Sequence, residues 1–185
     1  MKKIQSEATQ QKIQNAIIEL LQIKSYREIT IAEITKKSQI NRTTFYLFYS
    51  SKEELIRDIT FRFIDWYVET LGKTFLLNGE TDKMLLNDTF KKIKKQSKLI
   101  KILLNIQIND FVPYLEIKSG IEKIVYKGLK GKANNERIIL ISKLYASSAI
   151  TTVEWWINNC NNYSEDFIFE IIYSCLYKGM TTLIE

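Results

Sequence analysis

Residues 30–55 read TIAEITKKSQINRTTFYLFYSSKEEL, and this stretch decides the fold of the 185-residue chain. Thr30 stands three residues before Glu33. That spacing is typical of a capping box, in which each side chain hydrogen-bonds the other residue's free backbone N–H at the start of a helix. Ser51 stands at the same spacing before Glu54. The stretch therefore predicts one helix that begins after Thr30 and another that begins after Ser51.

A further helix start lies between the two boxes. Asn41 is a residue type favoured at N-caps, and the apolar Phe45 and Phe48 follow it. We expect a helix over residues 31–37, a short turn over 38–40, and a second helix from Asn41 through Phe48. Two short helices joined by a tight turn form a helix-turn-helix, whose second helix enters the major groove of DNA.

The second helix has side chains suited to reading DNA. Ile31 and Ile34 are expected to pack beneath Phe45, which leaves the other face of this helix exposed. Its outward side chains are Arg42, Thr43, Thr44, Tyr46 and Leu47. Arginine can bond a guanine edge in bidentate fashion, threonine can bond a base or touch a thymine methyl, and tyrosine can reach phosphate. Lys52 begins the next helix, where its charge and the helix dipole both attract phosphate. The alternative is that these residues only hold three helices together.

The rest of the chain continues in helical patterns. With one proline and six glycines, little along the chain would interrupt a helix. The remaining expected helices cover residues 8–23, a long segment from Lys52 with Leu55, Ile59, Phe63, Tyr67 and Leu71 inward, and residues 82–97, 98–109, 113–129, 136–158 and 164–184. No segment shows the alternation of a strand. The prediction is an all-α protein with a three-helix DNA-binding domain over residues 1–50 and a helical regulatory and dimerisation domain over 51–185.

Charge and residue content narrow the function. The net charge of +6 suits a polyanionic partner, although abundant lysine also serves solubility alone. A lysine-rich run with no acidic residue spans residues 91–109, either as a solvated helix face or as a basic patch for an anionic ligand, nucleic acid or acidic partner. The chain has no histidine and two cysteines, so we expect no metal site, no cofactor and no catalytic residue. Cys160 and Cys175 are expected to be reduced core residues. No signal peptide or membrane-length apolar run is visible, which predicts a cytoplasmic protein.

Residues 8–60 resemble the TetR/AcrR family of transcriptional regulators. The resemblance rests on TIAEI at 30–34 and on INRTTFYLFYSSKEEL at 40–55, above all on its aromatic cluster followed by Ser-Lys-Glu-Glu-Leu. It implies that Arg42 and Thr43 read base edges, and that Tyr46, Leu47 and Lys52 contact the phosphate backbone. The DNA contacts expected in all are Thr30, Asn41, Arg42, Thr43, Thr44, Tyr46, Leu47 and Lys52.

Three positions depart from the family pattern. Gln39 stands where most members have glycine, so the turn must adopt its left-handed residue at some cost or relax. Phe48 replaces a histidine that donates to phosphate, and Leu47 lacks the hydroxyl of a tyrosine often found there. We therefore expect fewer phosphate contacts than usual and a shallower dependence of DNA affinity on salt.

The resemblance also implies a homodimer, because the last two helices of each family member pair into a four-helix interface. The final helix is apolar on most sides, which independently favours burial against a partner. The interface residues expected are Ile141, Tyr145, Ser148, Thr152, Phe169, Tyr173 and Leu176. Two-fold symmetry predicts a palindromic operator whose half-sites are multiples of about 34 Å apart.

Control of DNA binding remains open between two mechanisms. The family often binds a small-molecule effector in the regulatory domain, and Tyr67, Phe111, Tyr114 and Tyr145 are candidate ligand contacts, although core packing is the better default explanation for each of them. In the adjacent pair Trp155 and Trp156, one side chain is expected in the core and the other facing a partner or cavity. The leading hypothesis is a repressor released by an effector. The alternative is a regulator controlled by a protein partner, which a solid core without a cavity would favour.

Overall fold

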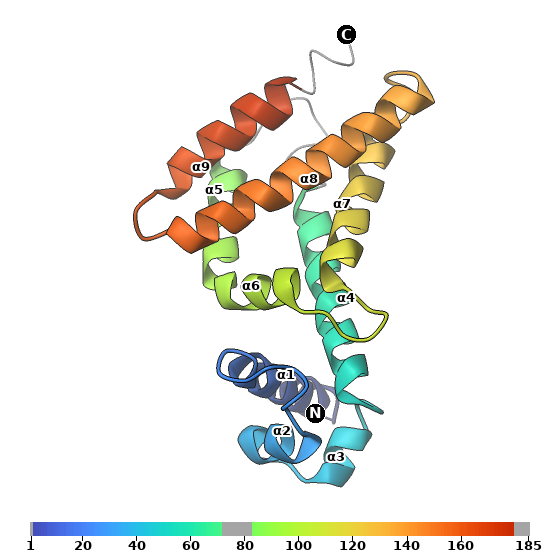
Figure 1. Cartoon of the computed structure of the whole chain (residues 1–185), viewed down its shortest axis with the longest axis vertical. Coiled ribbons are helices and arrows are strands. Elements are labelled where there is room, and N and C mark those ends of the chain that lie inside the picture. The colour runs from blue at the N-terminus through green and yellow to red at the C-terminus, as the bar shows by residue number, and fades with distance from the viewer. Residues whose placement is uncertain (1, 72–82, 180–185) are drawn as a thin grey trace.

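The computed structural model describes residues 2–71 and 83–179 and confirms the all-α class within them. The helices are α1 (Lys2–Leu20), α2 (Ile31–Ser38), α3 (Arg42–Tyr46), α4 (Lys52–Leu71), α5 (Lys83–Lys95), α6 (Ser97–Asn105), α7 (Pro113–Leu129), α8 (Asn135–Asn159) and α9 (Glu165–Ile172), followed by a π-helical segment, Tyr173–Lys178. Figure 1 shows α1–α3 gathered at one end of the molecule and α5–α9 at the other. Helix α4 runs from the first group into the second.

The caps that start α2 and α3 are those expected from the sequence. The Thr30 hydroxyl accepts a bond from the Glu33 N–H at 3.2 Å, and the Glu33 carboxylate accepts one from the Thr30 N–H at 2.9 Å. The Asn41 side-chain oxygen accepts from the Thr44 N–H at 2.7 Å. These bonds satisfy N–H groups that have no partner within the helix, and they fix where each helix begins.

The start of α4 differs in one detail from the expected capping box. The Ser51 hydroxyl accepts from the Glu54 N–H at 3.1 Å, as predicted. The Glu54 carboxylate, however, accepts from the backbone N–H and the hydroxyl of Ser50, both at 2.6 Å. The carboxylate therefore closes the preceding turn as well as the helix end.

Several helix boundaries lie elsewhere than predicted. Helix α1 ends at Leu20, and beyond it the N–H groups of Gln22 and Ile23 bond carbonyls only three residues back, which tightens the chain into turns. Helix α6 ends at Asn105, where the sequence suggested residue 109. Beyond it, Ile108 and Phe111 exchange backbone bonds of 2.9 and 2.7 Å, and Asn109 adopts a left-handed φ of 48°. The last α-helix ends at Ile172, and residues 180–184 of the predicted helix lie outside the described residues.

A continuous core joins the two groups of helices. In the N-terminal group, Ile17 of α1, Ile34 of α2 and Phe45 of α3 are completely buried against one another's helices. Leu55, Ile59 and Phe63 of α4 are buried as predicted, and Tyr67 is half-buried; Leu71 lies outside the side chains that the structure describes. One long helix thus contributes to both ends of the core.

Helix α4 crosses α7 at unusually short range. A Cβ atom on Gly120 of α7 would lie 2.7 Å from the Cγ2 atom of Ile64 on α4. A larger residue at this position would therefore force Ile64 or the helices to shift. Helix α7 in turn packs along α8, where Trp156 is fully buried and Trp155 is 44% exposed, so the tryptophan pair divides between core and surface as predicted.

Both cysteines are free, but the prediction that they are core residues is wrong for one of them. Cys160 is half-buried, whereas Cys175, in the π-helical segment, is exposed. Within residues 2–71 and 83–179, no helix combines the length and apolar character needed to cross a membrane.

Candidate nucleic-acid interface

Helix α3 presents its polar face to solvent. Arg42 and Thr43 are exposed, Tyr46 is 54% exposed and Leu47, directly after the helix, is 78% exposed. Phe45 points the opposite way and is fully buried. The face predicted to read DNA is therefore open, and the packing of α3 does not require those four side chains.

Three other predicted DNA contacts serve as caps. The Thr30 hydroxyl donates to Glu33, and the Thr44 hydroxyl donates to the Asn41 oxygen at 2.8 Å. These interactions occupy the side-chain oxygens of Thr30 and Asn41 with local bonds. Both residues are exposed at helix N-termini, where free backbone N–H groups attract phosphate. Their geometry allows a DNA contact through backbone and amide groups, while it fixes α2 and α3.

The Lys52 side chain, predicted to contact phosphate, is hydrogen-bonded to backbone carbonyl groups of the α1–α2 loop. Its ammonium donates to the carbonyl oxygens of Tyr26 at 2.7 Å and Ile29 at 2.6 Å, with that of Arg27 at 3.5 Å. The same ammonium lies 4.3 Å from the centre of the Tyr26 ring. Burial lowers the pKa of Lys52, and the nearby Glu33 charge opposes that shift. The lysine thus holds the loop between α1 and α2 against the start of α4; its contact with phosphate stays a prediction.

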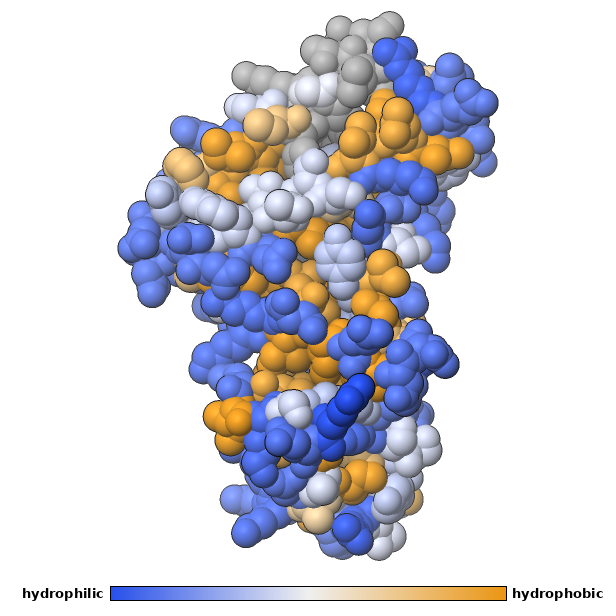
Figure 2. All heavy atoms as spheres, in the orientation of Figure 1, coloured by the Kyte–Doolittle hydropathy of each residue, from blue (hydrophilic) through white to orange (hydrophobic). Residues whose placement is uncertain are grey.

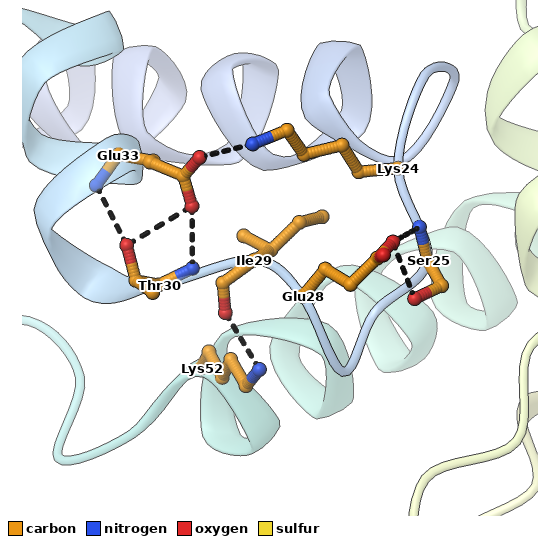
Figure 3. Close-up of polar contacts among 7 residues, drawn as sticks. All are labelled: Lys24, Ser25, Glu28, Ile29, Thr30, Glu33 and Lys52. Carbon is orange, nitrogen blue, oxygen red and sulfur yellow. Dashed lines mark hydrogen bonds and ion pairs between the residues drawn. The ribbon is translucent and has the colours of Figure 1, made fainter.

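The α1–α2 loop is held by further polar contacts (Figure 3). The Ser25 backbone N–H and hydroxyl both donate to the Glu28 carboxylate, at 3.0 and 2.8 Å. Lys24 forms an ion pair with Glu33. Hydrogen bonds from Lys24 and from Thr30 hold the pKa of the Glu33 carboxyl at about 2. Glu33 therefore fastens the loop and caps α2 with one carboxylate.

The turn between α2 and α3 contains the strained left-handed residue expected at Gln39. Gln39 adopts the left-handed conformation, with φ 56° and ψ 43°, and its N–H bonds the Lys36 carbonyl at 3.3 Å. A side chain with a Cβ atom is strained in this region, whereas glycine is not. The turn has thus kept the geometry of a glycine turn without the glycine.

Replacing Gln39 by glycine is expected to raise the free energy of unfolding by about 1 kcal/mol, because relief of the left-handed strain exceeds the added entropy of the unfolded chain. Urea denaturation measures the change. Gln39→Ala is the matched control, because alanine retains the Cβ atom and should leave stability within about 0.5 kcal/mol of the parent. Equal stabilisation by alanine and glycine would show that the strain lies elsewhere.

A polar cluster that the sequence did not predict ties α1 to α4. The Tyr49 hydroxyl donates to the Asp58 carboxylate at 2.7 Å, and the Gln14 amide donates to the same oxygen at 2.9 Å. The Gln10 amide and the Arg62 guanidinium complete the set, at 3.2 and 2.9 Å. Burial and the bond to Asp58 raise the pKa of Tyr49 to about 12. The one visible signal is Gln14, a polar residue on the apolar face of α1.

Of the residues predicted for a dimer interface, two are buried inside their own subunit and four are half-buried. Ile141 and Tyr145 are only 5% exposed and face the interior of their own bundle. Ser148, Thr152, Phe169 and Tyr173 are half-buried, and the side chain of Leu176 lies outside those described. The exposed apolar side chains of α8 and α9 are instead Ile139, Leu140, Leu144, Trp155, Phe167 and Ile171, together with Tyr163 in the loop between the helices.

The residues predicted for ligand binding are not brought into one pocket. Tyr67 lines a cavity of about 20 Å³ inside the bundle, and burial raises its pKa to about 12. Burial, and after it the charge of nearby Tyr67, raise the pKa of Tyr145 well above its ordinary value. Phe111 packs instead at the α6–α7 loop, with its ring 4.2 Å from the Arg57 guanidinium. Tyr114 is half-buried at the start of α7.

Known proteins match this chain in sequence over its N-terminal part and in fold over nearly its whole length. Residues 13–59 match the family model described as bacterial regulatory proteins, tetR family. A segment of 50 residues is 46% identical to an uncharacterized HTH-type transcriptional regulator, YxbF, of Bacillus subtilis (strain 168); it spans 26% of this chain and 13% of that protein.

Two solved structures share the fold over nearly the whole chain. A TetR transcriptional regulator from Streptococcus agalactiae 2603V superposes with a TM-score of 0.64 at 23% identity, covering 95% of this chain and 97% of its own. The dihydroxyacetone kinase operon activator DhaS superposes with a TM-score of 0.60 at 19% identity, covering 95% and 96%. Residues 13–59, which include the helix-turn-helix, thus match the TetR family of transcriptional regulators in sequence, and the helical fold resembles that of TetR regulators over nearly the whole chain.

Proposed function

We propose that this protein binds double-stranded DNA as a homodimer and represses genes adjacent to a palindromic operator. The observation that carries the proposal is the exposed face of α3, where Arg42, Thr43, Tyr46 and Leu47 are free of the core. Arg42 bonds a guanine edge, Thr43 a neighbouring base, and Tyr46 a phosphate. The DNA-binding domain comprises residues 1–50 and the regulatory domain 51–185, and the protein acts in the cytoplasm, where its DNA lies.

The remaining contacts position the recognition helix. Thr30 and Asn41 offer phosphate the N-termini of α2 and α3, with Thr44 supporting the Asn41 cap. Leu47 makes an apolar contact beside the backbone. Lys52 approaches phosphate at the start of α4 while it holds the α1–α2 loop.

The dimer forms through the exposed apolar side chains of α8 and α9. Leu140, Leu144 and Trp155 recur at helical spacing on α8, and Phe167 and Ile171 do so on α9. Figure 2 shows hydrophobic side chains over α9 and over the N-terminal half of α8. A patch of this kind is unusual on a monomer, and two-fold pairing of two helices per subunit covers it.

Operator binding tests the proposal. Fluorescence anisotropy of DNA from upstream of the gene is expected to show palindrome-dependent binding that Arg42→Ala weakens by about 1–3 kcal/mol, because a bidentate guanine contact is lost. Arg137→Ala removes an equally exposed arginine at the start of α8 and should leave affinity unchanged. Binding that ignores the palindrome and survives Arg42→Ala would reject α3 as the reader.

Whether the protein represses or activates transcription is tested by a separate experiment. A dimer that covers an operator overlapping a promoter excludes polymerase, which is the basis for proposing repression. DhaS is named as an activator, so the shared fold is compatible with both signs. A reporter gene behind the operator should gain expression when the regulator is deleted; a loss of expression would make the protein an activator.

Release by a small-molecule effector is the first candidate mechanism of control, and control by a protein partner is the second. The small cavity at Tyr67 favours the second over an effector bound at that place. The space lined by Tyr67 and its neighbours is about 20 Å³, close to that needed for one water molecule. Drug-sized ligands occupy pockets of roughly 300–1,000 Å³. In cell extract separated by size, the fraction that releases the operator is expected to be large and protease-sensitive. Release by the small-molecule fraction alone would reject this mechanism.

A further inference from the structure

We propose that the cleft between the α1–α2 loop and α6 binds a small organic anion, of the phosphate-ester class. The cleft measures about 690 Å³, within the range of small-molecule sites. One wall comes from the DNA-binding end of the molecule and the other from the regulatory bundle. Anion binding in this cleft does not depend on operator recognition.

Positive charge gathers in the cleft from both walls. Lys24 and Arg27 come from the α1–α2 loop, and Lys98 and Lys101 from α6. None of the described residues that line the cleft carries a carboxylate. Lys24 pairs with Glu33 of α2, whereas no described carboxylate lies within ion-pair distance of Arg27, Lys98 or Lys101. Four cations around one concavity concentrate an attractive field for an anion.

The same cleft has an apolar side that inorganic phosphate would leave unused. Leu21 and Tyr26 line it from the N-terminal wall, and Ile102 and Ile106 line it from the side of α6. Figure 2 shows hydrophobic side chains between α1 and α6 with hydrophilic ones on either side. The combination of cations and an apolar surface fits an organic group that carries a phosphate.

A neighbouring hollow extends the basic surface. It measures about 560 Å³, lies between α1, α4 and the α5–α6 junction, and shares Gln22 and Lys98 with the first cleft. Lys95 and Arg62 line this extension, beside the single carboxylate of Glu19. Lys98 therefore stands where the two spaces meet and is the cation best placed to contact a bound anion.

The position of the cleft in the fold favours a small molecule, and not operator DNA, as its ligand. Helix α1 packs against α2 on one side and against α6 on the other, so it separates the cleft from the helix-turn-helix (Figure 1). DNA seated on the exposed face of α3 does not reach the wall formed by α6. An occupant of the cleft must therefore be a separate anion.

Lys24 connects the cleft to the start of α2. Its ammonium is paired with Glu33, whose carboxylate also caps α2 (Figure 3). An anion in the cleft competes with Glu33 for this ammonium. Binding of an anion in the cleft therefore changes the contacts of Glu33 at the start of α2, without any contact between the ligand and DNA.

Isothermal titration calorimetry with phenyl phosphate, at constant ionic strength and without DNA, tests the proposal. We expect saturable binding of one phenyl phosphate per chain, tighter than that of inorganic phosphate because the ring covers the apolar wall. Lys98→Gln combined with Lys101→Gln should weaken binding by at least about tenfold, since two charge-assisted contacts are lost. Lys91→Gln combined with Lys92→Gln removes the same charge from exposed positions of α5 outside the cleft and should change affinity less than about twofold.

Two outcomes would overturn the proposal. Equal weakening by both pairs of substitutions would mean that phosphate responds only to net charge, and the absence of saturable binding would mean that the cleft holds no anion. All four lysines are exposed, so thermal unfolding should show that both variants fold like the parent. A failure of operator recognition would leave these results intact, because the titration contains no DNA.

Discussion

A protein with Leu144→Glu and Phe167→Glu is expected to be a monomer and to lose at least about 100-fold in operator affinity. The mass measured by light scattering should fall to that of a single chain, 21.8 kDa. Leu144 is 55% exposed on α8 and Phe167 is 38% exposed on α9, so neither change disturbs the buried core. Size-exclusion chromatography with light scattering, followed by anisotropy on operator DNA, measures both effects.

The physical reason is the cost of burying carboxylates at the proposed two-fold interface. Each subunit would bring two new charges against the same two charges of its partner, and removing an ion from water costs several kcal/mol even after relaxation. A monomer carries one recognition helix and can contact one half-site only. Operator affinity therefore falls with dimer affinity, although α3 itself is unchanged.

Leu115→Glu is the matched control for this prediction. Leu115 is 57% exposed on α7, almost the same exposure as Leu144, but it lies outside the α8–α9 surface. This variant should remain a dimer and bind operator normally. A dimeric Leu144→Glu/Phe167→Glu protein with native operator affinity would exclude α8 and α9 from the interface.

Local signals explain why so much of the fold could be predicted from the sequence. Thr30, Asn41 and Ser51 each bond an N–H three residues ahead, and such bonds depend only on neighbouring residues. Pro113 begins α7 for an equally local reason, because its fixed φ suits the first turn of a helix. The left-handed conformation of Gln39 also follows from its place in the turn.

The register of a long helix is harder to predict. Helix α8 is apolar on several sides, and the sequence does not distinguish the face that packs on α7 from the face left exposed. The expected interface contained Ile141 and Tyr145, whereas the exposed stripe contains their neighbours Leu140 and Leu144. A shift of one residue turns a helix by about 100°, so the choice depends on which helices pack nearby.

Contacts between distant parts of the chain account for the rest. Lys52 bonds carbonyls more than twenty residues away, and Gln14 meets Asp58 from a different helix. Neither pairing leaves a repeating pattern in the sequence. The family resemblance directs attention to Lys52 as a phosphate contact, but only the folded chain brings its ammonium to the carbonyl groups of the α1–α2 loop.

Replacing Asp58 by alanine is expected to lower the free energy of unfolding by about 3 kcal/mol. Asp58 accepts bonds from Tyr49 and Gln14, which are 3% and 7% exposed. Without the carboxylate, the Gln14 amide still donates to the Tyr49 hydroxyl at 3.1 Å, but the hydroxyl itself, a buried donor, loses its acceptor. Urea denaturation at unchanged m-value measures the loss.

Asp65→Ala provides the control on the same helix. Asp65 is exposed on α4 and belongs to no described hydrogen bond or ion pair, so its removal should change stability by no more than about 0.5 kcal/mol. Similar, small effects of the two alanine variants would mean that water replaces the Asp58 carboxylate and that the cluster does not stabilise the fold.

A double-mutant cycle then separates the cluster from the loss of one charge. Tyr49→Phe removes only the hydroxyl that donates to Asp58, so it leaves the buried ring against Phe45. If the hydroxyl and the carboxylate act together, the Asp58→Ala/Tyr49→Phe protein should be more stable than the sum of the single effects predicts, by about 1 kcal/mol or more. Additive effects would instead assign the loss to the pairs that Asp58 makes with Gln14, Arg62 and Gln10. Because Tyr49 follows the recognition helix and Asp58 lies on α4, a positive coupling would identify this cluster as the polar link that holds α3 at a fixed angle to the long helix.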